Sequence, residues 1–431
     1  MTWDLIVVGG GISGMAVAAM TARQGARVLV LERADFLGGN GRYSAGLVWT
    51  APSYDVLRQR CSDGDPAKQQ ALIGGFNSTL DVLRGLGVEV GPRLDGLSGF
   101  GCGHRIDISA TLATLRQVVE QPGGQVRLRA RDVRVHTKAR SLYTVASSTS
   151  GASQIDRSAV LVTATGGFQG SPPLLRRWLG AEAEQMLLRS NRYSGGAGLE
   201  IGLALGGSPT PNMGGFYGHL VPSPLASFQP EMFRALTQYQ SERCLALNMR
   251  GARFVDESLG DPVINQACLR QPGGQAVLVF DECIRNAMAG SPRFPGDQTI
   301  DRYAIAVKSG ARVVECPDAQ RLVAALENWG LPNDATADSI LDRFGEDEVR
   351  GTLYAMQVQP SITFTYGGLR TDVNGRVLTD DTNVLPGLFA VGADAGGTFG
   401  PGYAGGLASS LVSAHLAAGV ISGHGGVSHG S

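Results

Sequence analysis

Residues 4–32 read DLIVVGGGISGMAVAAMTARQGARVLVLE, and this stretch decides the fold. The apolar run LIVV predicts a buried strand, the glycines of GGGISG follow at once, and the apolar residues up to Gly25 predict a helix. RVLVLE then predicts a second strand, which closes on Glu32. A strand, a glycine turn, a helix and a strand that ends in an acid form the fingerprint of a dinucleotide-binding unit.

The loop residues indicate which dinucleotide binds. The backbone amides of Gly11 to Gly14 would lie at the N-terminus of the helix, where unpaired donors and partial positive charge suit a pyrophosphate. Glu32 would accept hydrogen bonds from the adenosine ribose. Gly38-Gly39-Asn40 follows too early for an NAD site and would run along a longer cofactor. The spacing favours FAD, although many of the 61 glycines are expected at ordinary turns.

Two later segments repeat the pattern of an apolar strand followed by glycines. They are AVLVTATGGF at 159–168 and LPGLFAVGADAGG at 385–397, and both predict buried parallel strands. The intervening residues 208–361 contain more proline and charge and several amphipathic stretches, so we predict an inserted domain there. Asn374-Gly375, between alternating residues, predicts a hairpin with a type I′ turn.

Composition excludes several classes of protein. The 431 residues include 37 Lys and Arg against 38 Asp and Glu, so the chain lacks the basic footprint of a nucleic-acid binder. The N-terminus lacks the features of a signal peptide, and no run of about eighteen apolar residues predicts a membrane span. The six cysteines form no C-x-x-C pair, so we expect no metal site and a cytoplasmic protein with reduced thiols.

Eight motifs together carry a family resemblance. In chain order they are GGGISG, Glu32, GGNGRYSAG, ATGGF, NMRGARFVDE, TYGGLRTD, LPGLFAVGAD and GYAGGL. Over nearly its whole length the chain resembles the fumarate reductase and succinate dehydrogenase flavoprotein superfamily. Among the branches it looks most like the tricarballylate dehydrogenase-like flavoproteins, and its C-terminal loop is similar to that of ketosteroid dehydrogenases.

The resemblance implies an α/β fold and an FAD site. A Rossmann-type, glutathione reductase-like FAD domain would comprise residues 1–207 and 362–431, and an α+β capping domain would comprise 208–361. Gly9, Gly11, Gly14 and Glu32 would bind the ADP half, Gly39 and Asn40 would run beside the pyrophosphate, and the backbone of Val133 would meet adenine. Asp394 would contact the ribityl or pyrophosphate region, and Gly405, Gly406, Leu407 and Ala408 would offer amides to the flavin pyrimidine edge. The same motifs imply further FAD contacts at Ile12, Ser13, Arg33, Gly41, Ser44, Ala45, Gly46, Ala164, Thr165, Gly166 and Gly392.

Two kinds of family residue are missing from the motifs. Some relatives attach FAD covalently to a histidine beside an Ala-Gly segment, but here this segment is Arg42-Tyr43-Ser44-Ala45-Gly46, so we expect non-covalent FAD. Fumarate-type relatives bind a dicarboxylate with a histidine and an arginine before two glycine turns, where this chain has Thr363-Phe364-Thr365-Tyr366 and Gly402-Tyr403-Ala404, so both binding residues are missing. Gly260 replaces their proton-donating arginine. Fumarate reduction by the family mechanism is therefore not expected.

Tyr403 suits a different substrate, because a phenol binds a carbonyl oxygen. With an amide at Gly405 or Gly406 it would form an oxyanion hole for enolate-like charge. The alternative is that Tyr403 only packs against the flavin ring.

The reaction also needs a general base. The candidates are Tyr217 and His219, followed by Tyr366 and Glu257. A lone histidine is often structural, and Glu257 would equally brace the inserted domain through Arg253.

These residues lead to three functional hypotheses. The first is an FAD-dependent dehydrogenase, or desaturase, that oxidises a Cα–Cβ bond next to a carbonyl, in a cyclic ketone or keto acid, by hydride transfer to flavin N5. The second is a carboxylic-acid dehydrogenase or reductase of the tricarballylate or fumarate type, with Arg42, Arg192 or another residue of the inserted domain binding the carboxylate. The third is a non-catalytic, flavin-binding electron-transfer subunit. No second dinucleotide fingerprint occurs, which favours an oxidase or an acceptor-linked dehydrogenase of a small-molecule substrate over a pyridine-nucleotide reductase. The electron acceptor is not identified by the sequence.

Overall fold

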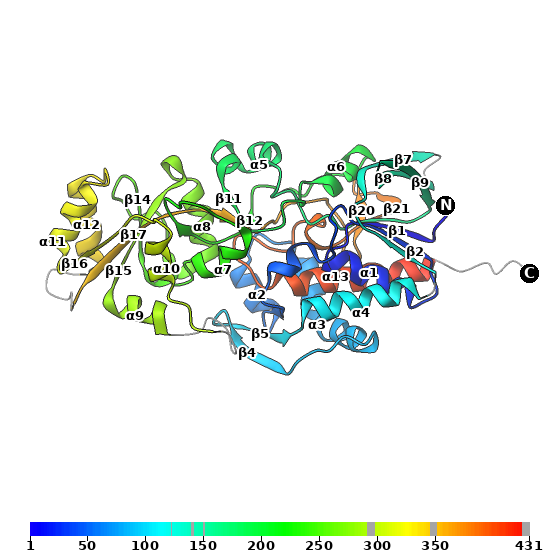
Figure 1. Ribbon diagram of the computed structural model, residues 1–431, viewed down its shortest axis with the longest axis horizontal. Helices are drawn as coiled ribbons and strands as arrows, with labels where there is room; N and C mark the ends of the chain where they lie inside the picture. Colours follow the sequence, from blue (N-terminus) through cyan, green and yellow to red (C-terminus); the bar gives the residue numbers. More distant parts are fainter. Residues whose placement is uncertain (122, 139–141, 150, 291–297, 345–350, 425–431) are drawn as a thin grey trace, which may run out of the picture. The chain divides into compact units, whose positions relative to one another are not determined.

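The computed structural model describes residues 1–121, 123–138, 142–149, 151–290, 298–344 and 351–424 (Figure 1). The chain divides into two compact units. Unit 1 comprises Met1–Leu174, Ser190–Gly215 and Phe364–Ser431, and unit 2 comprises Leu175–Arg189 and Phe216–Thr363. Unit 2 thus includes a short segment, Leu175–Arg189, that lies before the predicted insertion. The assignment of substrate capping to the insertion stays a prediction.

Unit 1 is built on a six-stranded sheet of order β20-β21-β10-β1-β2-β6. The strands are β1 (Leu5–Val8), β2 (Val28–Leu31), β6 (Gln125–Arg127), β10 (Leu161–Thr163), β20 (Arg376–Leu378) and β21 (Val384–Ala390). All neighbours pair in parallel except β20, which is antiparallel to β21. The sequence predicted buried parallel strands within residues 4–8, 159–168 and 385–397, and β1, β10 and β21 confirm this prediction.

Two apolar helices lie side by side next to this sheet. Helix α1 (Ile12–Ala22) is buried at every residue and packs against α13 (Gly406–His424) and α4 (Ile108–Glu120) (Figure 1). Within the described ranges, α13 is the one helix long and apolar enough to cross a membrane by length and composition. It also packs against α3 (Pro66–Gly85), and its alanines are buried.

Smaller elements complete unit 1. They are the antiparallel sheet of β3 (Leu47–Thr50), β5 (Gly101–Arg105) and β4 (Arg93–Leu97), the antiparallel sheet of β7 (Arg131–Lys138), β8 (Leu142–Thr149) and β9 (Ala152–Ser158), and helices α2 (Tyr54–Arg60) and α6 (Ala197–Ala204). A buried ion pair connects the six-stranded sheet to the sheet of β7, β8 and β9. Arg127 Nη1, on β6, lies 2.7 Å from Asp156 Oδ2, on β9.

The predicted type I′ turn is wrong. Asn374 does not take the positive φ that this turn requires, and only Gly375 does, at φ 78°. The Gly375 amide donates to the Asp372 carbonyl, and the Asp372 side chain accepts from the amides of Asn374 and Arg376 at 3.0 and 2.9 Å. The aspartate side chain therefore stabilises a longer turn, a competing interaction that the Asn-Gly pair does not reveal.

Unit 2 has a five-stranded antiparallel sheet with helices on both faces. Its strands are β13 (Val221–Pro222), β14 (Leu245–Asn248), β15 (Ala276–Asp281), β16 (Val313–Cys316) and β17 (Leu353–Gln359). Alternate residues of β15 enter two separate hydrophobic clusters, as the period of a strand requires. One cluster includes α8 (Asp261–Leu269), α9 (Glu282–Gly290) and α10 (Arg302–Lys308), and the other includes α11 (Ala319–Glu327) and α12 (Asn333–Phe344).

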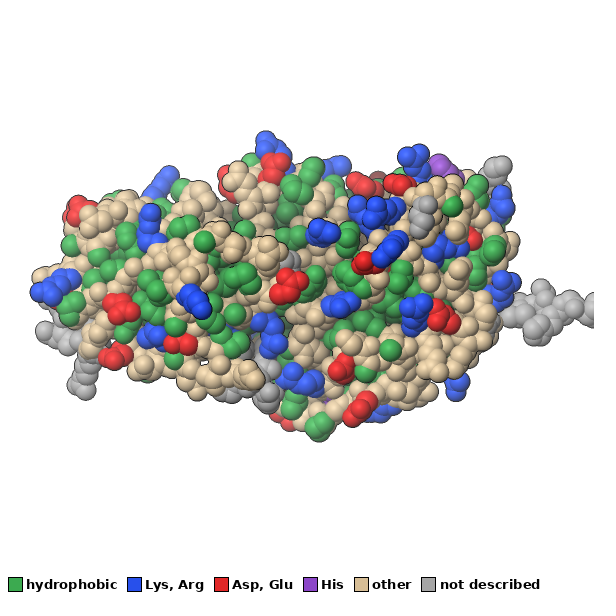
Figure 2. All heavy atoms as spheres, viewed as in Figure 1, with side chains coloured by type: hydrophobic (Ala, Val, Ile, Leu, Met, Phe, Trp, Pro, Cys, Tyr) green, Lys and Arg blue, Asp and Glu red, His purple; other side chains and the backbone are tan. Residues whose placement is uncertain are grey.

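The surface agrees with the balanced charge of the sequence. On the face drawn in Figure 2, basic and acidic side chains are interspersed with apolar ones, and no broad region carries one sign of charge.

Candidate functional site

The predicted cofactor loops meet at one edge of the unit 1 sheet. Gly9 follows β1, Glu32 follows β2, Ala164 follows β10 and Gly392 lies just after β21. Because these strands are parallel, their carboxyl ends share an edge, and this edge is where doubly wound sheets bind ligands. The structure thus brings together residues from four widely separated parts of the chain.

The first glycine loop packs closely at the start of α1. Gly9 has φ 111°, and a Cβ on Gly14 would lie 2.0 Å from the Gly9 carbonyl oxygen, so neither position accepts a side chain. Gly11 caps the helix without a side-chain hydrogen bond. The amide of Gly38 donates to the Gly10 carbonyl at 2.8 Å, which aligns the second loop beside the first. Bare amides at a helix N-terminus fit the pyrophosphate of FAD.

Two backbone amides hold the carboxylate of Glu32 in place. Its two carboxylate oxygens accept from the amides of Gly10 and Ala34, both at 2.7 Å. Burial raises the pKa of Glu32, and these amide hydrogen bonds oppose that rise. Each oxygen keeps a second lone pair, so the predicted ribose contact is compatible with this arrangement and stays a prediction.

Asp394 has a structural role that the sequence did not indicate. Its carboxylate accepts from the amides of Thr165, Gly166 and Gly167 at 2.6, 3.1 and 2.9 Å, and from the Thr165 hydroxyl. Burial raises the pKa of Asp394, with the same hydrogen bonds opposing the rise. Asp394 therefore shapes the ATGG loop, and a contact with the ribityl chain stays a prediction.

The other predicted cofactor residues lie around these loops. Asn40 Oδ1 accepts from the Asn191 amide at 2.7 Å, and a Cβ on Gly392 would lie 2.5 Å from the Ser13 hydroxyl. Val133 lies on β7 at a register irregularity. Gly405 takes φ 90°, and a Cβ there would lie 1.6 Å from the Trp49 carbonyl oxygen, so this position requires glycine.

Tyr403 lies in an aromatic cluster of unit 1. We define this aromatic cluster as Trp49, Phe364, Tyr366, Phe399 and Tyr403. The Tyr403 ring centroid lies 5.5 to 6.0 Å from those of Trp49, Phe364 and Phe399, and the Gly406 amide donates to the Tyr403 hydroxyl at 2.7 Å. Tyr366 is buried against the two phenylalanines. The sequence had not indicated Trp49 or Phe399, because no motif spacing connects them with Tyr403.

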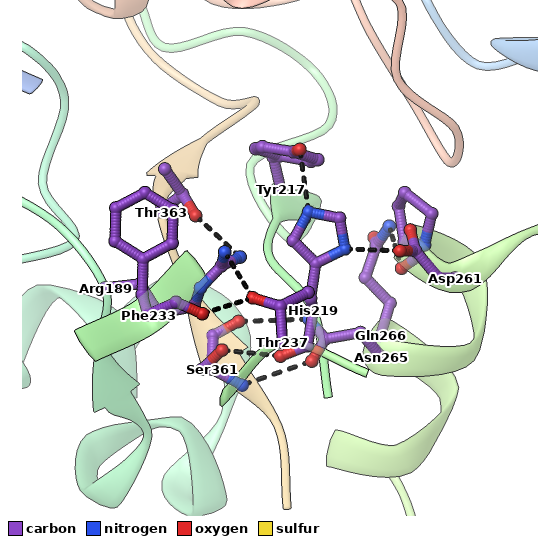
Figure 3. Close-up of polar contacts among 11 residues, drawn as sticks. Arg189, Tyr217, His219, Phe233, Thr237, Asp261, Asn265, Gln266, Ser361 and Thr363 are labelled. Carbon is purple, nitrogen blue, oxygen red and sulfur yellow. Dashed lines mark hydrogen bonds and ion pairs between the residues drawn. The ribbon is translucent and has the colours of Figure 1, made fainter. Parts of the chain in front are cut away.

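Two of the predicted bases in unit 2 contact each other (Figure 3). His219 Nε2 lies 2.7 Å from the Tyr217 hydroxyl, and His219 Nδ1 lies 2.6 Å from Asp261 Oδ2. His219 and Asp261 are both 4% exposed, whereas Tyr217 is partly exposed. Asp261 follows Gly260 directly in the chain, and no motif indicated that it contacts His219.

Glu257 is engaged in bracing the unit. Its carboxylate forms an ion pair with Arg253 and accepts from the Ala246 amide at 2.8 Å, and its side chain is buried. These contacts match the structural alternative for Glu257, since both oxygens already have partners.

Comparisons with known proteins place the chain in a family. A family model described as FAD binding domain matches residues 91–409, and one described as FAD dependent oxidoreductase matches residues 4–167. The chain belongs to the FAD binding domain family. FAD is its cofactor, and it is an oxidoreductase of the fumarate reductase and succinate dehydrogenase flavoprotein superfamily.

Individual relatives include both reductases and dehydrogenases. The chain is 23% identical to a fumarate reductase (cytochrome) of Shewanella frigidimarina, over 95% of this chain and 75% of that one. It is 29% identical to a 3-oxosteroid 1-dehydrogenase of Mycolicibacterium smegmatis, over 43% of this chain and 39% of that one. The structure of a 3-ketosteroid-Δ4-(5α)-dehydrogenase from Rhodococcus jostii RHA1 superimposes with a TM-score of 0.74 at 20% identity, covering 98% and 97% of the chains. This likeness supports the α/β flavoprotein fold.

Proposed function

We propose that the protein is a dehydrogenase that introduces a double bond between Cα and Cβ next to a carbonyl, in a cyclic ketone or keto acid. The observation that carries the proposal is the hydrogen bond from the Gly406 amide to the Tyr403 hydroxyl within the aromatic cluster. This bond orients the phenol and strengthens its O–H as a donor. A substrate carbonyl that accepts from Tyr403 would be stabilised as its oxygen gains negative charge.

The chemistry divides between the cofactor and the chain. Bound FAD supplies the hydride acceptor. The chain would bind the carbonyl through Tyr403, exclude water with the aromatic side chains and remove the α-proton. Trp49, Phe364 and Phe399 offer apolar surface around the phenol, which suits a ring better than a charged group. A relative named 3-oxosteroid 1-dehydrogenase supports a cyclic ketone as the substrate class.

The carboxylic-acid alternative has less support from this site. The two segments without the histidine and arginine of fumarate-type relatives, residues 363–366 and 402–404, contain Phe364, Tyr366 and Tyr403 of the aromatic cluster. Arg42 and Arg192, the proposed substitutes, are exposed, and their guanidinium carbons lie 4.6 and 5.1 Å from the ring centroids of Phe36 and Tyr193. A fumarate reductase among the relatives keeps this alternative as the one to test.

An anaerobic spectrum tests the proposal. The purified flavoprotein is mixed without an electron acceptor with cyclic ketones, keto acids and tricarboxylates. Bleaching of the flavin band by a ketone supports the proposal, and bleaching by carboxylates alone overturns it in favour of the second hypothesis. A spectrum that no compound changes favours the electron-transfer subunit. A cytoplasmic location and non-covalent binding of FAD stay predictions. The electron acceptor is not identified.

A further inference from the structure

We infer that Gln69 is a positioning residue for the proposed reaction. Its side chain holds residues 396–402, which we define as the Tyr403 loop because this segment leads directly into Tyr403. The inference rests on the proposed function and identifies what fixes the phenol in addition to the Gly406 amide. All of these residues belong to unit 1.

The Tyr403 loop depends on other parts of unit 1 for its conformation. Its sequence is GGTFGPG, with glycine at four of its seven positions, and it belongs to no helix or strand. Glycine leaves the backbone many accessible conformations, so this sequence does not select one of them. The conformation of the loop must therefore come from contacts with distant segments of the chain.

The turn between α2 and α3, residues 61–65, lies along this loop. The Asp63 amide donates to the Gly400 carbonyl at 2.7 Å. The Asp65 amide donates to the Gly397 carbonyl at the same distance. The two backbones also pack closely, since a Cβ on Gly64 would lie 2.4 Å from a carbonyl oxygen of the loop. The turn therefore supplies a template for the backbone of the Tyr403 loop.

Gln69 connects the turn and the loop through one side chain. It lies on α3 and is 0% exposed. Its Nε2 donates to the Thr398 carbonyl at 3.1 Å and to the Cys61 carbonyl at 2.8 Å. Its Oε1 accepts from Arg58 Nη1 at 3.1 Å, and the same Nη1 donates to the Gly64 carbonyl at 2.6 Å. One hydrogen-bond network thus includes α2, the turn, α3 and the Tyr403 loop.

The partners of this side chain match an amide. Two carbonyl oxygens need two N–H donors, and a guanidinium needs an acceptor, and an amide group offers both. These partners also fix the orientation of the amide, because the reverse orientation would place its oxygen against two carbonyl oxygens. A leucine at position 69 occupies similar space but removes both donors and the acceptor, which leaves buried polar groups unsatisfied.

The loop passes the position of Gln69's partner Thr398 to the phenol through Phe399. Phe399 directly follows Thr398, and its ring centroid lies 5.5 Å from that of Tyr403 and 6.0 Å from that of Tyr366. A displaced Thr398 carbonyl would therefore move a ring that packs against the phenol. A misplacement of about 1 Å at a reacting group can slow a reaction about 10²-fold, even when the changed residue lies away from the chemistry.

Rapid kinetics test the inference. The substrate is the cyclic ketone that bleaches the wild-type flavin fastest, and the limiting rate is measured per bound flavin without an electron acceptor. Gln69→Leu should lower this rate about 10- to 10²-fold and change the half-saturating ketone concentration little. Gly64→Ala is a second variant that disturbs the same contact, since its Cβ would lie 2.3 Å from Gln69 Nε2. It should lower the rate in the same way.

The matched control is Thr79→Val. Thr79 is a buried polar residue on the same helix, and its hydroxyl donates to the Gly75 carbonyl and lies 2.9 Å from His415 Nδ1. This change also removes buried hydrogen bonds, but it does so away from the Tyr403 loop. The control should keep the wild-type rate, so that a general loss of stability is separated from a displaced phenol.

A spectroscopic readout does not depend on turnover. In protein labelled with 3-fluorotyrosine, the ¹⁹F resonance of Tyr403 is the one that Tyr403→Phe lacks. It should move in Gln69→Leu and in Gly64→Ala, and it should keep its position in Thr79→Val. An unmoved resonance or a wild-type rate in either folded variant would overturn the inference. If no ketone bleaches the wild-type flavin, the proposed function fails, and the ¹⁹F spectrum still decides whether Gln69 positions the phenol.

Discussion

The Gly406 amide donates to the Tyr403 hydroxyl at 2.7 Å, so the start of helix α13 orients the phenol that we propose binds the substrate carbonyl. Gly405 directly precedes this helix, and its positive φ and its close approach to the Trp49 carbonyl oxygen exclude any side chain. The Tyr403 phenol and the Gly406 amide that orients it thus lie in the same turn of the chain.

Tyr403→Phe should slow anaerobic flavin reduction by a cyclic ketone about 10²- to 10³-fold, the usual loss for one oxyanion donor. The ring still packs against Trp49 and Phe399, so flavin content should change little. The part-buried Gly406 amide loses its acceptor, which should lower the stability by about 1 to 3 kcal/mol. Stopped-flow absorbance measures the rate, and thermal unfolding measures the stability. If the rate is unchanged, Tyr403 does not bind the carbonyl.

We predict that the first glycine loop, residues 9–14, does not accept a side chain at Gly14. Gly14→Ala places a Cβ 2.0 Å from a backbone oxygen, so we expect loss of FAD and severe destabilisation. Gly74→Ala is the matched control in helix α3, where a Cβ would meet nothing within 4 Å. It should stabilise the protein by about 0.5 to 1 kcal/mol. Flavin absorbance and urea unfolding measure both variants, and a stable, yellow Gly14→Ala protein would contradict the packing described.

Asp394→Asn tests the carboxylate that shapes the ATGG loop. An amide side chain offers one acceptor oxygen, and its NH₂ group faces backbone donors, so at least one buried amide loses its partner at a cost of about 1 to 3 kcal/mol. We expect weaker FAD retention on gel filtration and a lower midpoint of unfolding. Asp81→Asn, an exposed partner of Arg84, should lose no more than about 1 kcal/mol. Equal effects of the two changes would argue against a special role for Asp394.

Local patterns in the sequence were enough to predict the cofactor half of the protein. The strand ending at Val8, the loop to Gly14 and the acid Glu32 are close in the chain, and the family model confirms that they belong to an FAD-binding fold. Contacts that shape the cofactor loops are non-local. Asp394 lies 229 residues from Thr165, whose amide donates to its carboxylate, and no periodicity connects them.

Non-covalent FAD is a prediction that denaturation can test. The Arg42-Tyr43-Ser44-Ala45-Gly46 segment contains no histidine for a flavin linkage. Precipitation with trichloroacetic acid should therefore leave all the yellow colour in the supernatant. Flavin that stays in the protein pellet would show a covalent bond, and peptide mapping would locate it.

Lys68 should make the stability of the protein depend on alkaline pH. Its Nζ donates to the Gly396 carbonyl at 2.6 Å, and burial lowers its pKa to about 8, against the opposing effect of Asp65 and Asp372. The unfolded chain has the ordinary lysine pKa near 10.4, so between about pH 8 and 10.4 the unfolded state binds more protons than the folded state.

Stability contributed by this group should therefore rise as pH rises through that window and be constant below it. Lys68→Met removes the titrating amine and keeps an unbranched side chain. The difference in free energy of unfolding between wild type and Lys68→Met, measured in urea at pH 7.5 to 10.5, should shift in favour of wild type as pH rises. Because groups elsewhere cancel in this difference, curves that run parallel over the whole range would show that the ammonium of Lys68 is not penalised in the folded protein.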